Sequence, residues 1–189
     1  IIDDIAWFTT FIDFSGGEPL LNKEIFDMCQ YARQKNIYTM ISSNIQLLSR
    51  DNNLEKLLQS PPDEIIIAYD GLEKEVYETI RKKGNFEQLV KNIEDLVRLK
   101  KERNAQFPLL TMQMVLTKKN RHMKHDFWKA AQDFGVDKAM IKPIGLWPEA
   151  DPQYDKKMTQ EYIVPRNEES ISRHDIEEGE PVFIRWPGQ

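Results

Sequence analysis

The feature that most constrains this chain is a regular alternation of strand-like and helix-like segments over its first 145 residues. Short apolar runs that end in glycine, serine or asparagine alternate with stretches whose apolar residues recur every three or four positions. The predicted strands cover residues 11–15, 37–42, 64–69, 109–117 and 138–143. Helix-like stretches connect them, so the pattern predicts an α/β fold of parallel βα units.

Two topologies fit this pattern, a closed or partial barrel and an open doubly wound sheet. The clearest helix follows Asn85, a predicted N-cap, and its apolar residues form one stripe. The strand at 109–117 has one apolar face and one semi-polar face. Such a strand suits a sheet whose concave side holds a ligand.

The composition changes after residue 145, where five prolines are spread among dense charges. We therefore divide the chain into a core over residues 1–145 and an irregular tail, or a bridge to another domain, over 146–189. The chain begins with Ile1 in a helix-like segment and stops without a closing element. These cues lead us to expect an internal piece of a longer protein.

Charge and cysteine content exclude several classes of function. The chain has 26 Lys and Arg against 31 Asp and Glu, a net charge of −5, which disfavours a duplex nucleic-acid partner. The sequence has no run of about 18 apolar residues, so it predicts no membrane span. Cys29 is the single cysteine of the sequence, so no multi-cysteine metal site can form within it. We predict that Cys29 is a small buried residue of a helix.

Polar residues follow four of the predicted strands, at the edge where parallel sheets bind ligands. After the first strand, Gly16 and Gly17 allow a tight bend, and Glu18 supplies a carboxylate that can accept hydrogen bonds from an ammonium group. The alternative is a plain strand-to-helix turn. The other strand ends carry Ser42-Ser43-Asn44, Asp70-Gly71 and Thr117-Lys118-Lys119-Asn120.

The segment Gly16-Gly17-Glu18-Pro19 resembles the GGEP signature of radical S-adenosylmethionine (radical SAM) enzymes. Several later segments match that family in order and spacing, over about residues 10–145. They are Ile41-Ser42-Ser43-Asn44, Tyr69-Asp70-Gly71 with Tyr77 and Ile80-Arg81, Asn85-Phe86-Glu87 with Asn92-Ile93, and Val115-Leu116-Thr117 with Asn120. The resemblance is closest to the branch with C-terminal cysteine-rich, SPASM-like extensions.

The resemblance implies a partial TIM-like (β/α)6 barrel of parallel strands, here missing its first strand. It implies two cofactors, S-adenosylmethionine and a 4Fe-4S cluster held by three cysteines. It also implies a 5′-deoxyadenosyl radical that abstracts hydrogen from a peptide, protein or small-molecule substrate. An electron donor such as flavodoxin or ferredoxin and a cytoplasmic location go with this chemistry.

The resemblance assigns cofactor-binding roles to seven residues and no catalytic acid or base. Gly16, Gly17 and Glu18 would hold the methionyl ammonium group. Asp70, Ser43 and Asn44 would lie near the ribose or the substrate, and Arg81 would pair with the methionyl carboxylate.

The sequence departs from the family at three points. It lacks the cysteine triplet, so the cluster ligands are expected outside this chain and the fragment alone is expected to be inactive. Ala68 stands where a serine is common, and Ile45 stands where a glycine is common.

Two other classes of function remain open. A cluster-less barrel could act as a ligand-binding or scaffold protein, and a TIM-type lyase or hydrolase would need paired carboxylates or a metal triad. The basic segment at 118–125, which includes His122 and His125, is a weaker metal or phosphate candidate and is typical of a solvated loop.

Overall fold

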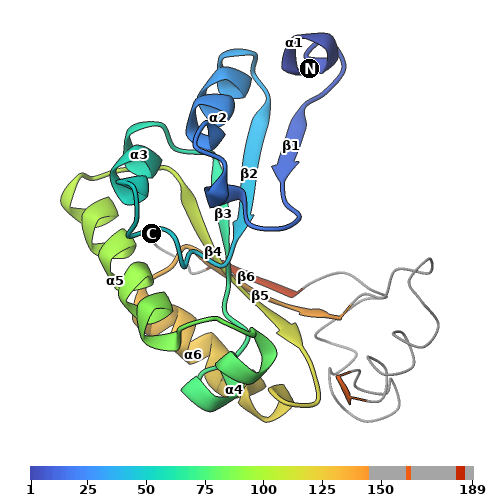
Figure 1. Ribbon diagram of the computed structural model, residues 1–189, viewed down its shortest axis with the longest axis vertical. Coiled ribbons are helices and arrows are strands. Elements are labelled where there is room, and N and C mark those ends of the chain that lie inside the picture. The colour runs from blue at the N-terminus through green and yellow to red at the C-terminus, as the bar shows by residue number, and fades with distance from the viewer. Residues whose placement is uncertain (145–160, 163–181, 186–189) are drawn as a thin grey trace.

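The computed structural model describes residues 1–144, 161–162 and 182–185 (Figure 1). The described part forms one six-stranded sheet, with helices between successive members of the first five strands. The strands are β1 (Phe11–Phe14), β2 (Tyr38–Ser43), β3 (Glu64–Ala68), β4 (Leu109–Leu116), β5 (Lys138–Pro143) and β6 (Val182–Arg185). The α-helices are α1 (Ile2–Ile5), α2 (Ile25–Gln34), α3 (Asn53–Gln59), α4 (Lys74–Ile80), α5 (Phe86–Glu102) and α6 (Lys124–Phe134). Two 3₁₀ turns, η1 (Pro19–Leu21) and η2 (Arg121–Met123), follow β1 and β4.

The order of the strands in the sheet is the order along the chain, and β1 to β5 are parallel. Each right-handed crossover therefore steps in the same direction and places its helix on the same face. Figure 1 shows α2, α3, α5 and α6 gathered on one side of the sheet. This is the arrangement of a barrel wall, and it rules out the doubly wound alternative, which has helices on both faces. The sheet is not closed into a complete barrel.

The hydrophobic core lies between the sheet and this helical layer. Alternate residues of the central strands enter it, among them Ile41, Ile65, Ile67, Met112 and Met114, each with 0% of its surface exposed. Helix α5 contributes its apolar stripe, and Asn85 caps it as predicted, accepting a bond of 2.9 Å from the backbone N–H of Gln88. Helix α6 is capped at its C-terminal end by Gly135, whose φ of 78° is a left-handed conformation that glycine adopts readily.

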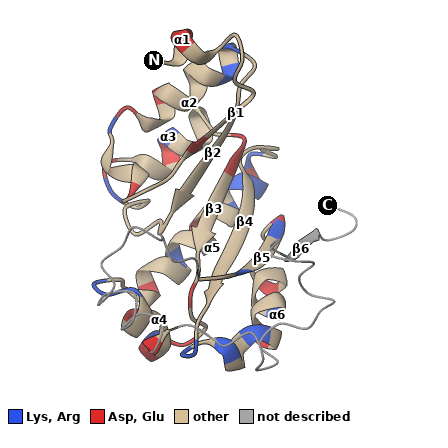
Figure 2. Cartoon of the chain, turned by 90° about the vertical axis from the view of Figure 1, so that its right-hand side faces the viewer, with Lys and Arg blue, Asp and Glu red and all other residues tan. Residues whose placement is uncertain are grey.

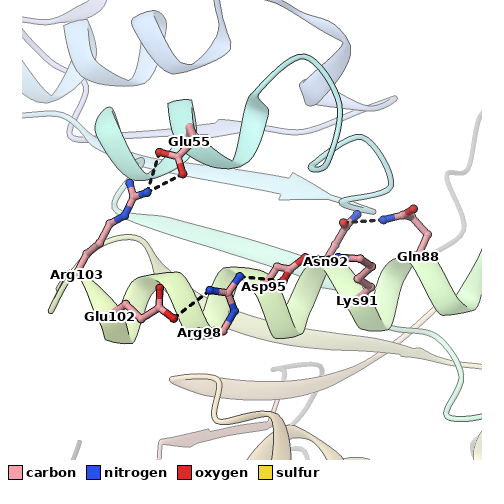
Figure 3. Close-up of polar contacts among 8 residues, drawn as sticks. All are labelled: Glu55, Gln88, Lys91, Asn92, Asp95, Arg98, Glu102 and Arg103. Carbon is pink, nitrogen blue, oxygen red and sulfur yellow. Dashed lines mark hydrogen bonds and ion pairs between the residues drawn. The ribbon is translucent and has the colours of Figure 1, made fainter.

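The solvent side of α5 carries a chain of ion pairs (Figure 3). Asp95 pairs with Lys91 at 2.7 Å and with Arg98 at 3.1 Å, and Arg98 pairs with Glu102 at 3.0 Å. The next residue, Arg103, bonds both carboxylate oxygens of Glu55 on α3. These contacts fix the polar face of α5 outward and tie its C-terminal end to α3.

The opposite face of the sheet, which we call the inner face, has a buried carboxylate near the amino ends of the strands. Glu64 accepts hydrogen bonds from Tyr38 Oη at 3.0 Å, from Lys138 Nζ at 3.0 Å and from Thr111 Oγ1. Burial and the nearby Glu64 charge raise the pKa of Tyr38. The carboxylate is thus satisfied by groups from three other strands, and we interpret it as a structural link across the inner face.

One part of the predicted tail forms regular structure. Strand β6 pairs antiparallel with β5, with Met140 opposite Phe183. The expectation of an irregular tail is corrected there, because an added strand satisfies the backbone groups on the outer edge of β5. Most of 146–189 lies outside the described residues. Helix α2 begins at Ile25, and the side chain of Asn22, three residues earlier, accepts a bond from the backbone N–H of Glu24 at 3.0 Å.

Candidate functional site

The bend after β1 is built around the carboxylate of Glu18. Glu18 Oε1 accepts from the Ser43 hydroxyl at 2.6 Å and from the Leu20 backbone N–H at 3.1 Å, and Oε2 accepts from the Asn44 backbone N–H at 3.0 Å. These three bonds join the carboxyl ends of β1 and β2. A carboxylate has about four acceptor positions, so one position remains for a further donor. The side chain is only half-buried, and an ammonium group can approach it.

The two glycines before Glu18 are conformationally required. Gly16 has a φ of +84° and Gly17 a φ of +66°, values that disfavour any residue with a Cβ. Both are exposed, and a Cβ built on either meets no atom within 4 Å. The space beside Glu18 is therefore open on the side of the glycines.

The turn after β2 keeps a glycine-like conformation although it carries isoleucine. Ile45 has a φ of +48° and is fully buried. Its N–H donates to Ser43 Oγ at 2.8 Å, and its carbonyl accepts from Asn92 Nδ2 at 2.6 Å. Ile45 therefore has a left-handed backbone that glycine adopts more readily, and this stores strain at a β-branched residue.

Because of this strain, we expect glycine to be more stable than alanine at position 45, which is the reverse of the usual order for these two residues. Ile45→Ala removes the buried side chain and keeps the left-handed strain, whereas Ile45→Gly removes both. We expect Ile45→Gly to be more stable than Ile45→Ala by about 1 kcal/mol, measured by urea unfolding of the full-length protein. At Ile41, a fully buried strand residue, glycine should be the less stable of the pair. If the same residue, glycine or alanine, gave the more stable variant at both Ile45 and Ile41, that result would contradict the strain at Ile45.

Asp70 and Arg81 form the second part of the site. Asp70 is 1% exposed, and its Oδ2 accepts from Arg81 Nε at 2.6 Å. Its Oδ1 accepts from the backbone N–H of Val115 at 2.7 Å, and its backbone carbonyl accepts from Asn120 Nδ2 at 3.0 Å. Asp70 thus joins the ends of β3, α4 and β4. The Arg81 side chain is 36% exposed, and its terminal nitrogens have no partner among the described residues.

Tyr77 and Gln46 connect the two parts. Burial raises the pKa of Tyr77, and its hydroxyl is close enough to Arg81, Asp70 and Glu18 to sense all three charges. Gln46 Nε2 donates to the Tyr77 hydroxyl at 3.3 Å and to the Asn85 carbonyl at 3.1 Å. Five of the seven predicted residues therefore form two hydrogen-bonded groups, Glu18 with Ser43 and Asn44 and Asp70 with Arg81, and the other two are the glycines before Glu18.

Sequence reasoning missed Gln46 as a bridging residue, and no local pattern marks it, because its partners lie 31 and 39 positions away. Tyr77, Asn92 and Asn120 were noted only as motif matches. Their roles follow from buried contacts with the backbone and side chains of other segments.

The profile of the Radical SAM superfamily matches residues 1–127 of the chain. The chain belongs to the radical SAM superfamily. Its relatives include the mycofactocin maturase MftC of Mycolicibacterium smegmatis, 25% identical over 159 residues that cover 80% of this chain and 39% of MftC. The GTP 3′,8-cyclase of Chlorobaculum tepidum is 26% identical over 161 residues, which are 74% of this chain and 48% of the cyclase. The chain thus spans less than half of these relatives.

Solved structures agree on the fold. SuiB of Streptococcus suis, solved bound to S-adenosylmethionine, superposes with a TM-score of 0.59 at 14% sequence identity. The match covers 79% of this chain and 35% of SuiB. The α/β sheet of this radical SAM chain therefore corresponds in fold to part of SuiB. The members named here are enzymes, and the family uses S-adenosylmethionine and a 4Fe-4S cluster.

The residues of this chain fit the two cofactors differently. The free acceptor position on Glu18 and the open space beside the glycines fit the amine of S-adenosylmethionine. The described residues contain no group of three His, Cys, Asp or Glu side chains placed to hold a metal ion. The single cysteine, Cys29, is fully buried on α2, as predicted. This chain does not supply the ligands of the iron–sulfur cluster.

The state of Cys29 gives a direct test of its role. Burial raises the pKa of its thiol to about 12, so at pH 8 the reactive thiolate is about 0.01% of the population. We expect iodoacetamide to leave Cys29 unmodified in the native full-length protein and to modify it in guanidinium chloride. Peptide mapping by mass spectrometry measures this. Rapid labelling of the native protein would show that the thiol is exposed and ionised.

The basic segment after β4 lies on the same edge of the sheet. Figure 2 shows Lys and Arg gathered around the start of α6. Lys119 pairs with Glu161 at 3.0 Å, and its ammonium lies 4.5 Å from the ring centre of Tyr162. His122 and His125 are exposed and belong to no metal-binding group among the described residues. No helix in the described part is long and apolar enough to cross a membrane.

Proposed function

We propose that this chain is the cofactor-binding core of a radical SAM enzyme and that it holds the methionyl end of S-adenosylmethionine at Glu18. The observation that carries the proposal is the Glu18 carboxylate, fixed by Ser43, Asn44 and Leu20 with one acceptor position left. A charge-assisted hydrogen bond from the ammonium group fills that position. The open space beside Gly16 and Gly17 admits the methionyl chain.

The remaining residues have positioning roles in this proposal. Ser43 and Asn44 hold the Glu18 carboxylate and stay within reach of the ribose or substrate. Asp70 orients the guanidinium of Arg81 through Nε, which leaves the two terminal nitrogens of Arg81 free to pair with the methionyl carboxylate. Asp70 itself is already engaged on both oxygens, so it acts through Arg81.

We further propose that the whole protein carries out radical chemistry on a peptide, protein or metabolite. In this family the cluster and the cofactor together supply a 5′-deoxyadenosyl radical that removes hydrogen from the substrate. A peptide substrate is favoured by the named relatives, since SuiB has been solved with its precursor peptide SuiA. An acidic electron donor such as flavodoxin or ferredoxin and a cytoplasmic, reducing location complete the proposal.

The test is anaerobic reconstitution of the full-length protein with iron and sulfide, followed by assay of 5′-deoxyadenosine in the presence of a reductant. Iron incorporation together with cleavage of S-adenosylmethionine supports the enzyme. Binding of S-adenosylmethionine without iron or cleavage would instead support a cluster-less ligand-binding protein.

A further inference from the structure

One buried polar side chain on the inner face has no hydrogen-bond partner among the residues that the structure describes. Eleven non-aromatic polar or charged side chains are buried in the described part of the chain. Ten of them take part in side-chain hydrogen bonds, which include those of Thr39, Asp63 and Asn92. The exception is Gln113 on β4, which is 4% exposed and whose amide bonds to none of the described residues. A primary amide can donate twice and accept twice, so this position leaves strong hydrogen-bonding groups unused.

The register of the sheet places this amide on the inner face. Gln113 lies opposite Ala68 on β3 and Met140 on β5. It is two residues after Thr111, whose hydroxyl bonds Glu64 on the inner face. Both neighbours are poor partners: Ala68 has only a methyl group, and Met140 offers a weakly accepting sulfur. Neither cross-strand neighbour can therefore satisfy the unused amide.

The position of Gln113 relative to Glu18 suggests what satisfies it. Glu18 follows β1 and Gln113 lies on β4, three strands away, which is about 14 Å across a sheet at the usual strand spacing. Gln113 is three residues before the end of β4, in the carboxyl-terminal half of the strand. The two ends of an extended S-adenosylmethionine, its amine and its adenosyl group, can therefore meet these two residues.

We propose that Gln113 binds the adenosyl group of S-adenosylmethionine through its side-chain amide, a contact that rests on the proposed function of Glu18. A glutamine amide presents a donor beside an acceptor, and this pair matches the N6 and N7 edge of adenine. The ribose hydroxyls offer the same kinds of partner. The amide remains unpaired in the free protein because the ligand provides its bonds, at the expense of stability without ligand.

The experiment compares Gln113→Met with Glu18→Gln in the full-length protein, with three probes: S-adenosylmethionine, adenosine and methionine. Methionine is close in shape to glutamine and needs no hydrogen bonds, so Gln113→Met is expected to keep or raise the melting temperature without ligand, by up to about 4 °C. Calorimetry should show about tenfold weaker binding of S-adenosylmethionine and adenosine, with methionine binding unchanged. Glu18→Gln should weaken methionine binding and leave adenosine binding unchanged.

Each outcome decides between the proposals. Unchanged adenosine and S-adenosylmethionine affinities in Gln113→Met would overturn the role of Gln113 and leave Glu18 intact. A lower melting temperature with unchanged affinities would show that the amide is structural and would overturn it as well. Wild-type protein that binds adenosine but not methionine would contradict the proposed role of Glu18 while supporting an adenosyl site, provided that Gln113→Met abolishes that binding.

Discussion

Glu18→Gln in the full-length protein is expected to raise the Kd for S-adenosylmethionine about 10- to 100-fold. The substitution removes the negative charge that faces the methionyl ammonium group, and a hydrogen bond to a charged group contributes about 1.5–3 kcal/mol. The amide can still accept from Ser43 or Asn44, so the bend between β1 and β2 should persist. Isothermal titration calorimetry under anaerobic conditions measures the change, and the iron content should stay at the wild-type level.

A matched control removes a carboxylate far from the strand ends. Glu102 lies at the end of α5 and pairs with Arg98 on the solvent side. Glu102→Gln loses the same charge and should leave the Kd unchanged. Equal affinities for the wild type and Glu18→Gln would remove the ammonium site from this structure and, with it, the proposed role of this chain.

Asp70→Ala is expected to lower the free energy of unfolding by about 2–4 kcal/mol. The change leaves the partly buried N–H of Val115 without its acceptor and removes the charge-assisted bond to Arg81. Because Arg81 also loses its orientation, binding of S-adenosylmethionine should weaken together with stability. Chemical denaturation and calorimetry of the full-length protein measure the two effects.

Two further variants separate the contributions of Asp70. Arg81→Met keeps the bond from Val115 and should weaken cofactor binding to a similar extent; the double variant should bind no more weakly than either single variant. The surface pair of Lys74 and Glu87 provides the control, because an exposed pair is screened by water and Glu87→Ala should leave stability unchanged. Additive losses in binding would show that Asp70 does not act through Arg81.

The sequence alone was sufficient for features that depend on local patterns. The alternation of apolar periods predicted all five parallel strands and their helices to within a few residues, because each segment must bury one face. The bend at the glycine pair and the Asn85 cap were equally predictable, since backbone conformation at a bend or a helix end is set by the residue itself. The family resemblance rested on these same local segments, and the profile match confirms it.

The sequence could not determine which polar groups form hydrogen bonds with one another. It also failed to predict the strand in the tail. Dense charge and proline predicted an irregular tail, whereas β6 forms because β5 offers a free edge. The sequence marked Asp70 and Arg81 as separate cofactor contacts; the fold makes them partners and turns Asp70 toward the backbone of β4.

The apolar periodicity thus determined the order and type of the elements up to β5, the glycine pair indicated the bend at Glu18, and the motif segments indicated the family. The tertiary structure alone decided that Glu18 is held by Ser43 and Asn44, that Asp70 holds Arg81, and that Gln113 is left unpaired. The reason is physical. Local conformation depends on neighbouring residues, whereas the satisfaction of a buried polar group depends on atoms that only strand register and packing bring together.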